Sequence, residues 1–231
     1  MKFFDSLIAD VYSEISRFHG NEYPFDKNKT RNDTGYSQVI MHRDTAFELS
    51  GTGMSLVTSS DVNDEIIVIG DELGKISDNR KFARISIVQT DDVADEQKAY
   101  NLIRKIEYVR YHYFPEGYMI RTASSSRKEA VRVAKSAIRD GISFETVGNL
   151  LIKKYKEIDA VRGVKVIFIT DSFADYGVLQ NIAEKADNIT KALNHIMNTV
   201  NFDCDTCNLK AVCDEVEGMR ELHFRNKEMK K

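Results

Sequence analysis

A run of nearly unbroken apolar residues at 164–169, Val-Lys-Val-Ile-Phe-Ile, constrains the fold more than any other feature of the sequence. A strand that is apolar at successive positions is buried on both faces, as an interior strand is when helices cover both sides of a sheet. Residues 118–121 also have strand character, and four short β-type runs separated by glycines indicate a meander. These runs cover residues 37–41, 46–49, 66–69 and 84–90. The pattern predicts a mixed sheet with residues 164–169 in its interior.

Apolar residues that recur every three or four positions predict helices packed against this sheet. Four such segments cover residues 3–18, 94–113, 144–156 and 174–200. A further helix is expected to begin at Ser125 or Ser126 as its N-cap and to end at Gly141. Its buried face would contain Ala130, Val133, Ala134, Ala137 and Ile138. The predicted fold class is therefore α+β, a mixed β-sheet packed with helices and followed by a cysteine-containing carboxyl-terminal tail.

The domain organisation follows from a stretch without periodicity. Residues 21–35 contain Pro24 among clustered Asn, Asp, Lys and Thr, which is typical of a linker or exposed loop, and Gly20 ends the helix before it. We therefore divide the chain into an amino-terminal helix and linker at 1–35, an α+β domain at 36–200 and a cysteine metal-binding tail at 201–231.

Composition excludes several classes of partner. The 231 residues are 42% apolar, enough for a substantial core, and the net charge of -3 lacks the basic footprint of a nucleic-acid binder. No apolar run approaches the roughly 20 residues that a membrane-spanning helix needs, and the first residues do not form a secretory signal. The three cysteines all lie within ten residues, a poor disulfide framework that indicates a reducing compartment. We therefore expect a cytoplasmic protein with neither nucleic acid nor membrane as a partner.

The three cysteines have the spacing Cys204-x2-Cys207-x5-Cys213, which predicts a metal or iron-sulfur site. Thiolates are soft ligands that suit zinc or an iron-sulfur cluster rather than calcium or magnesium. His223 is the nearest candidate for a fourth ligand, although in a continuous helix it would lie about 15 Å beyond Cys213. The alternatives are a redox pair formed by Cys204 and Cys207, three cysteines without a ligand, and a surface histidine at 223.

Two further sets of residues are candidates for binding. Residues 124–128, Ser-Ser-Ser-Arg-Lys, lie at a predicted helix start, where free backbone N–H groups and two cations could receive a phosphate. Asp171 and Asp175 follow the strongest strand, where α/β proteins often carry functional polar groups. In both cases the alternative is structural: a serine at 124–126 that caps a solvated helix, and residues 170–172, Thr-Asp-Ser, as the cap of the next helix.

Several short segments, taken in order, resemble one known family. They are residues 45–49, 66–70, Glu116-Gly117, 131–133 with Lys135, then Gly141, Phe144, Gly148 and Leu151, and finally 164–171. In this order they are similar to the acetyl-CoA synthase (beta) subunit of the CO dehydrogenase/acetyl-CoA synthase complex, in its middle domain and the start of its nickel-cluster domain. The resemblance extends from Asp44 to Cys213.

For the cysteines, the resemblance implies that Cys204 and Cys207 are the first two ligands of an iron-sulfur cubane and Cys213 the third. The sequence departs from the family in the loop before Cys213, which has five residues where the family has eight, and in His223, which replaces the fourth cysteine. The sequence also reaches Lys231 before the Cys-Gly-Cys that holds nickel in the family, so we expect no nickel chemistry from these residues.

For ligands, the resemblance implies coenzyme A, which the family's middle domain binds through arginines and a tryptophan. Arg132 matches a family arginine, whereas Met119 stands in the place of the tryptophan. Arg127, Lys128 and Arg132 are thus the candidate ligands of the coenzyme A phosphates.

We therefore expect an acetyl-CoA synthase-related accessory or binding module in carbon metabolism of the CO dehydrogenase/acetyl-CoA synthase type, as a subunit of such a complex. Its cofactor would be an iron-sulfur cluster, with zinc as the alternative. A structural zinc-binding protein with no catalytic role is the alternative function, and a redox sensor is a third. Whether the chain catalyses a reaction is left open.

Overall fold

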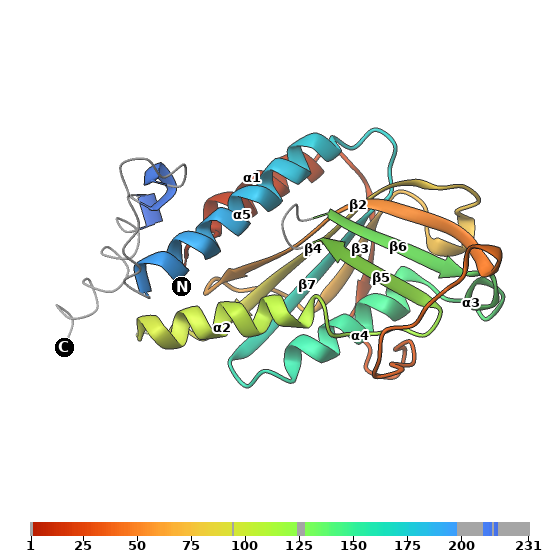
Figure 1. Ribbon diagram of the computed structural model, residues 1–231, viewed down its shortest axis with the longest axis horizontal. Coiled ribbons are helices and arrows are strands. Elements are labelled where there is room, and N and C mark those ends of the chain that lie inside the picture. Colours follow the sequence, from red (N-terminus) through yellow and green to blue (C-terminus); the bar gives the residue numbers. More distant parts are fainter. Residues whose placement is uncertain (1, 94, 124–127, 198–209, 214, 217–231) are drawn as a thin grey trace.

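In a computed structural model of the chain, residues 2–93, 95–123, 128–197, 210–213 and 215–216 are described (Figure 1). These residues form one mixed sheet of seven strands in the order β1-β3-β7-β4-β2-β6-β5. The pairs β2/β4 and β3/β7 are parallel, and the other neighbours are antiparallel. The strands are β1 Gly20–Pro24, β2 Thr45–Thr58, β3 Glu65–Ile69, β4 Arg80–Thr90, β5 Tyr118–Ala123, β6 Lys128–Ala134 and β7 Val161–Ile169. The predicted mixed sheet and α+β fold class are confirmed.

Helices cover both faces of the sheet. They are α1 Asp5–Ile15, α2 Glu96–Val109, α3 Lys135–Arg139, α4 Phe144–Lys156 and α5 Tyr176–Met197, with 3₁₀ turns η1 His42–Asp44 and η2 Leu73–Lys75. Helices α1 and α5 lie on one side of the sheet, and α2 and α4 lie on the other (Figure 1). The four helices predicted from periodicity are thus present, and α4 has the predicted ends. None of the helices in the described ranges has both the length and the hydropathy of a membrane span.

Strand β7 has the interior position that its apolar sequence predicts. It pairs with β3 on one side and with β4 on the other. Ile167 and Phe168 point to opposite faces and are both fully buried, because α4 covers one face and α5 the other. The Phe168 ring stacks on Phe144 of α4 at 4.6 Å between ring centres.

The glycines of β2 lie inside the strand, where the sequence indicated breaks between strands. A Cβ at Gly51 would lie 1.7 Å from the backbone oxygen of Phe82 in β4, so only glycine permits this approach of the two strands. The expected meander is wrong, because β2 pairs with β4 and β6 while β3 lies beyond β7. Residues 37–41 also form no strand.

The helix predicted to begin at Ser125 or Ser126 is wrong for residues 128–134, which form β6 between β2 and β5. Burial alternates along this strand, with Glu129, Val131 and Val133 inside and the intervening residues partly exposed. Only Lys135–Arg139 is helical, as α3.

The amino-terminal segment is part of the same layers. Strand β1 pairs with β3 at one edge of the sheet, and α1 packs on α5, so the loop predicted at 21–35 is wrong for residues 21–24. The division of the chain at residues 35 and 200 stays a prediction.

Strand β6 pairs with β2 only as far as Thr52, and α2 and α5 meet near the remaining part of β2. The Thr190 hydroxyl on α5 donates to Glu107 Oε1 on α2 at 3.1 Å, and both side chains are buried. The two helical layers are therefore joined directly.

Candidate functional site

Two of the residues expected to bind coenzyme A, Lys128 and Arg132, lie on a strand and not at a helix start. Arg127 lies outside the described residues, whereas Lys128 is the exposed first residue of β6 and Arg132 lies in the middle of that strand. Residues four apart lie about 13 Å from each other along a strand, so Lys128 and Arg132 do not converge on one phosphate. Residues 124–127 of the expected phosphate cradle lie outside the described residues, and Lys128, its last residue, begins a strand instead of a helix.

Arg132 is held by partners on both sides. Its Nε lies 2.6 Å from Glu48 Oε1 on β2, and its Nη1 donates to the Ile40 backbone oxygen at 3.3 Å. Met119, which stands in the place of the family tryptophan, is opposite Arg132 on β5. The Ile40 N–H also approaches the Met119 sulfur, at 3.2 Å. The sequence resemblance therefore identified two residues that are neighbours across the strands.

Most of the cysteine site lies outside the described residues. Cys204, Cys207 and His223 are among those not described, and Cys213 is half-buried in a short helical segment at 210–213. Cys213 and Val212 pack against the domain core, and Val216 is fully buried. The described ranges contain no cluster of three or more His, Cys, Asp or Glu side chains placed to hold a metal.

A hollow of about 570 Å³ opens where the parallel strands β3 and β7 end. We call it the β3/β7 hollow; it is lined by residues 70–71 and 78–81 on one side and by residues 170–174 and Tyr176 on the other. In α/β sheets, ligands bind outside the carboxyl ends of parallel strands, because the loops there diverge to leave a crevice. Its volume is within the range of small-molecule sites.

Close contact between the two loops fixes the floor of the hollow. Gly70 has φ +96°, and a Cβ there would lie 2.5 Å from the backbone nitrogen of Asp171. The Thr170 hydroxyl donates to the backbone oxygen of Asp71 at 2.8 Å, and the Thr170 N–H donates to that of Ile69 at 2.8 Å. These bonds hold the two loops side by side.

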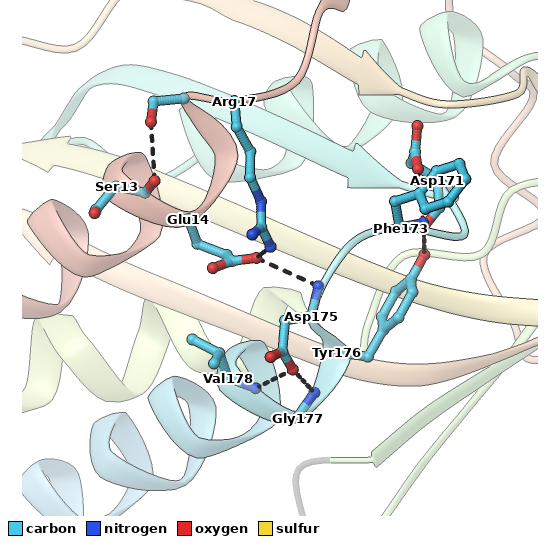
Figure 2. A network of polar contacts seen from close by, with 10 residues as sticks. Ser13, Glu14, Arg17, Asp171, Phe173, Asp175, Tyr176, Gly177 and Val178 are labelled. Carbon is cyan, nitrogen blue, oxygen red and sulfur yellow. Dashed lines mark hydrogen bonds and ion pairs between the residues drawn. The ribbon is translucent and has the colours of Figure 1, made fainter.

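Figure 2 shows how the turn after β7 is held. Asp171 Oδ1 accepts the Phe173 N–H at 2.8 Å, and the Tyr176 hydroxyl donates to the backbone oxygen of Asp171 at 2.9 Å. Burial raises the pKa of the Tyr176 phenol above its ordinary value, and the nearby Asp171 carboxylate raises it further. The hydroxyl therefore stays protonated and keeps donating over the physiological range.

Asp175 caps α5, whereas the structural alternative had assigned the cap to residues 170–172. Its Oδ1 accepts the N–H groups of Gly177 and Val178 at 2.9 and 3.0 Å, and its own N–H donates to Glu14 near the end of α1 (Figure 2). Asp171, in contrast, lines the hollow. Of the two aspartates chosen from the sequence, one is thus a helix cap and one belongs to a candidate site.

A chain of polar contacts links the hollow to Arg132. Asn79, in its lining, accepts the backbone N–H of Glu48 through Oδ1 at 2.7 Å, and the Glu48 carboxylate pairs with Arg132. Arg80 pairs with Asp71 at 2.7 Å on the same side. The candidate site predicted from the resemblance and the hollow found in the structure are therefore connected through one residue.

Sequence reasoning missed a buried ionic cluster. Arg84 on β4 binds Glu129 on β6 through two hydrogen bonds, of 2.9 and 2.7 Å, and Arg110 Nε lies 3.5 Å from the same carboxylate. Burial opposes ionisation of Glu129, but the Arg84 guanidinium holds its pKa below the ordinary value, with help from Arg110. No spacing rule singles out such residues, because they are distant in sequence.

A second hollow, of about 650 Å³, lies between the carboxyl-terminal ends of α2 and α4. Tyr108, 59% exposed, stacks on His112 at its rim, with 3.3 Å between ring centres. Its charged lining residues are mostly paired among themselves, as in Arg104 with Glu107 and Lys154 with Glu157.

The fold and the β3/β7 hollow define a mixed-sheet α+β domain with a ligand-sized crevice at the ends of its parallel strands. Residues 22–174 match the family model described as CO dehydrogenase/acetyl-CoA synthase complex beta subunit, from within β1 to the turn before α5. The chain belongs to this family, which confirms the resemblance seen in the sequence. No match was found among curated proteins.

Proposed function

We propose that this chain is a binding module of a CO dehydrogenase/acetyl-CoA synthase type complex that carries a metal centre on its cysteine segment. The observation that carries the proposal is the position of Cys213. Val212 and Cys213 pack against the hydrophobic core of the described residues, and Val216 is fully buried. A centre bound by Cys213 would therefore be held against the domain.

The donor set fits such a centre chemically. Three thiols within ten residues, two of them in a Cys-x2-Cys turn, are typical of zinc or iron-sulfur ligands. We expect Cys204, Cys207 and Cys213 to be ligands, with His223 as the candidate fourth ligand. An iron-sulfur cluster would supply a one-electron redox centre, whereas zinc would supply only folding energy.

Metal and acid-labile sulfide analysis of protein purified without oxygen tests the centre. We expect iron and sulfide in the wild type and neither in the Cys204→Ser/Cys207→Ser double variant. Zinc without sulfide would favour the alternative function, a structural zinc protein, which the packing of the tail on the core also suits. Protein with no bound metal at all would overturn both. The His223→Ala variant then decides the fourth ligand.

Coenzyme A is the proposed ligand of the domain, with Arg132 as the main phosphate contact. Family membership and the link from Arg132 through Glu48 to Asn79 in the lining of the β3/β7 hollow support this proposal. A coenzyme A phosphate would have to replace the Glu48 carboxylate, which Arg132 binds in the free protein. Lys128 is an exposed cation farther along the same strand, and Arg127 precedes it in the sequence.

Calorimetric titration with coenzyme A tests this ligand. Arg132→Glu should abolish binding, because it places a carboxylate where the phosphate would bind. Glu48→Gln should strengthen binding, because it removes the competing carboxylate and leaves Arg132 in place. Arg162→Glu is the matched charge reversal, since Arg162 is an exposed residue that pairs with Asp91 elsewhere. Equal affinity in Arg132→Glu and Arg162→Glu would refute the role of Arg132.

A further inference from the structure

The walls of the β3/β7 hollow carry three kinds of group that nothing above assigns to a ligand. They are an exposed aromatic ring, a cation and carboxylates, contributed by Phe173, Lys81, Asp171 and Asp78. Lys81 is fixed on strand β4, and Asp171 and Phe173 lie in the turn that the Thr170 and Tyr176 hydrogen bonds hold. The positions of these groups are therefore largely set before a ligand arrives, which reduces the entropy cost of binding.

Phe173 is the aromatic group. It is 85% exposed, the most exposed of the large hydrophobic side chains in the described part of the chain. Its backbone N–H bonds to Asp171, so the Phe173 side chain lines the hollow from a turn of defined shape. An exposed ring beside a cavity offers a stacking surface for a flat, aromatic group.

Lys81 is the cation. Its ammonium lies 5.9 Å from the centre of the Tyr176 ring. The ion pairs found among the described residues do not include Lys81, whereas Arg80 beside it is paired with Asp71. Lys81 can therefore bind an incoming anion without first breaking an ion pair.

The carboxylates set the remaining chemistry. Asp71, Asp78 and Asp171 exceed Arg80 and Lys81 by one negative charge, so the interior of the hollow does not favour an anion. Carboxylates accept hydrogen bonds from paired hydroxyl groups, and an acidic residue after a strand of a parallel sheet binds ribose in this way. A complementary ligand has a flat aromatic group at one end and paired hydroxyl groups in its middle. Both of these parts are uncharged, and a phosphate, if the ligand has one, binds at Lys81.

We propose that the β3/β7 hollow binds a nucleoside moiety, with its base on Phe173, its ribose hydroxyls on Asp171 and a 5′ phosphate, where present, at Lys81. The site goes beyond the metal centre and does not depend on Arg132.

Calorimetric titration of the full chain with adenosine and with AMP tests the assignment. Phe173→Ala and Asp171→Asn should each lower the affinity for adenosine by about tenfold. The analogue that lacks both ribose hydroxyls should bind the wild type about tenfold more weakly than adenosine does. Lys81→Ala should lower the affinity for AMP and leave the affinity for adenosine unchanged. Phe173 and Lys81 are exposed, so their variants should fold normally.

Tyr108→Ala, in the other hollow, and Arg162→Glu, at an exposed residue that pairs with Asp91, are the controls, and both should leave adenosine affinity unchanged. Absence of adenosine binding to the wild type would overturn the assignment, as would equal affinity in Phe173→Ala. Binding of inorganic phosphate as tight as that of AMP would also overturn it, because the base and ribose would then contribute nothing. Coenzyme A binding that fails while adenosine binds would refute only the coenzyme A proposal, and the reverse would refute only this one.

Discussion

Arg84 and Glu129 form a bidentate ion pair that crosses over an entire strand. Arg84 belongs to β4 and Glu129 to β6, and β2 lies between them with Gly53 at the crossing point. A Cβ at Gly53 would lie 2.1 Å from Glu129 Oε2 and 3.0 Å from Arg84 Nη2. Both charged side chains are fully buried, so the pair exchanges its hydration for hydrogen bonds inside the core.

Glu129→Gln should lower the free energy of unfolding by about 3–5 kcal/mol, because it leaves the Arg84 guanidinium buried without its counter-charge. Urea denaturation measures the loss. Glu48→Gln is the matched control, since it removes a partly exposed partner of Arg132 and should cost about 1 kcal/mol or less. Equal losses in the two variants would contradict the buried ion pair.

The same pair predicts how stability depends on acid pH. The pKa of Glu129 is lower in the folded protein than in the unfolded chain. Ionised Glu129 therefore contributes to the free energy of unfolding at pH values above its unfolded pKa of about 4.3. That contribution is lost as the pH falls from there through the folded pKa. Urea titrations over this range should show a steeper loss in the wild type than in Glu129→Gln. Parallel curves would show that another carboxylate controls acid unfolding.

Gly53→Ala should destabilise the protein by about 1–3 kcal/mol, because the added methyl group overlaps the Glu129 carboxylate. Gly74→Ala adds the same methyl group where no atom lies within 4 Å, and it should leave the unfolding midpoint almost unchanged. The comparison separates the overlap from the general effect of replacing glycine. A midpoint for Gly53→Ala that matches Gly74→Ala would show that the strands can move apart.

The half-buried Tyr176 and the fully buried Tyr118 should respond differently to loss of the hydroxyl. Tyr176→Phe removes the bond to the Asp171 backbone oxygen and should cost about 1 kcal/mol. Tyr118→Phe should be neutral or stabilising, because its buried hydroxyl has no hydrogen-bond partner among the described residues. Thermal or urea unfolding of both variants checks the contrast, and a larger loss in Tyr118→Phe would reverse it.

Together with Tyr113, these tyrosines predict how the stability of the fold changes at alkaline pH. Burial raises the pKa of the Tyr113, Tyr118 and Tyr176 phenols, so the folded protein holds their protons more tightly than the unfolded chain does. Their contribution to stability is full below the unfolded pKa of about 10 and is lost as the pH rises above it. Phenolate absorbance should therefore show these groups titrating together with unfolding. Complete titration of all ten tyrosines in the folded state would contradict this.

Sequence patterns correctly predicted the helices and strands whose buried positions hold apolar side chains. Strand β7 and helix α4 are examples, since their core positions are filled by aliphatic and aromatic side chains. Strand β6 was misread as part of a helix because one of its core positions is Glu129. A charged residue facing inward hides the period of two that Val131 and Val133 would otherwise complete. The partners that make this burial tolerable lie far away in the sequence.

The same reasoning explains other differences. Strand β1 is short and largely exposed at the sheet edge, so it carries no hydrophobic alternation to detect. Gly51 and Gly53 suggested turns because the reasons for glycine there, a backbone contact and an ion pair, are tertiary. Asp171 was identified by its position after a strand, but Lys81 could not be, because β4 is distant from Asp171 in sequence. Phe173 lies close to Asp171 in sequence, but its exposure is visible only in the structure.

Strand β7 is the last strand in the sequence, yet it lies between β3 and β4. Until residues 161–169 have been synthesised, β1 and β3 have no hydrogen-bonded connection to the strands on the other side. On the ribosome, the nascent chain would hold two unjoined pieces of sheet, each with an open edge facing the gap. Completion of the domain thus waits for a single late segment, and synthesis beyond β7 gives the chain its first opportunity to close the sheet.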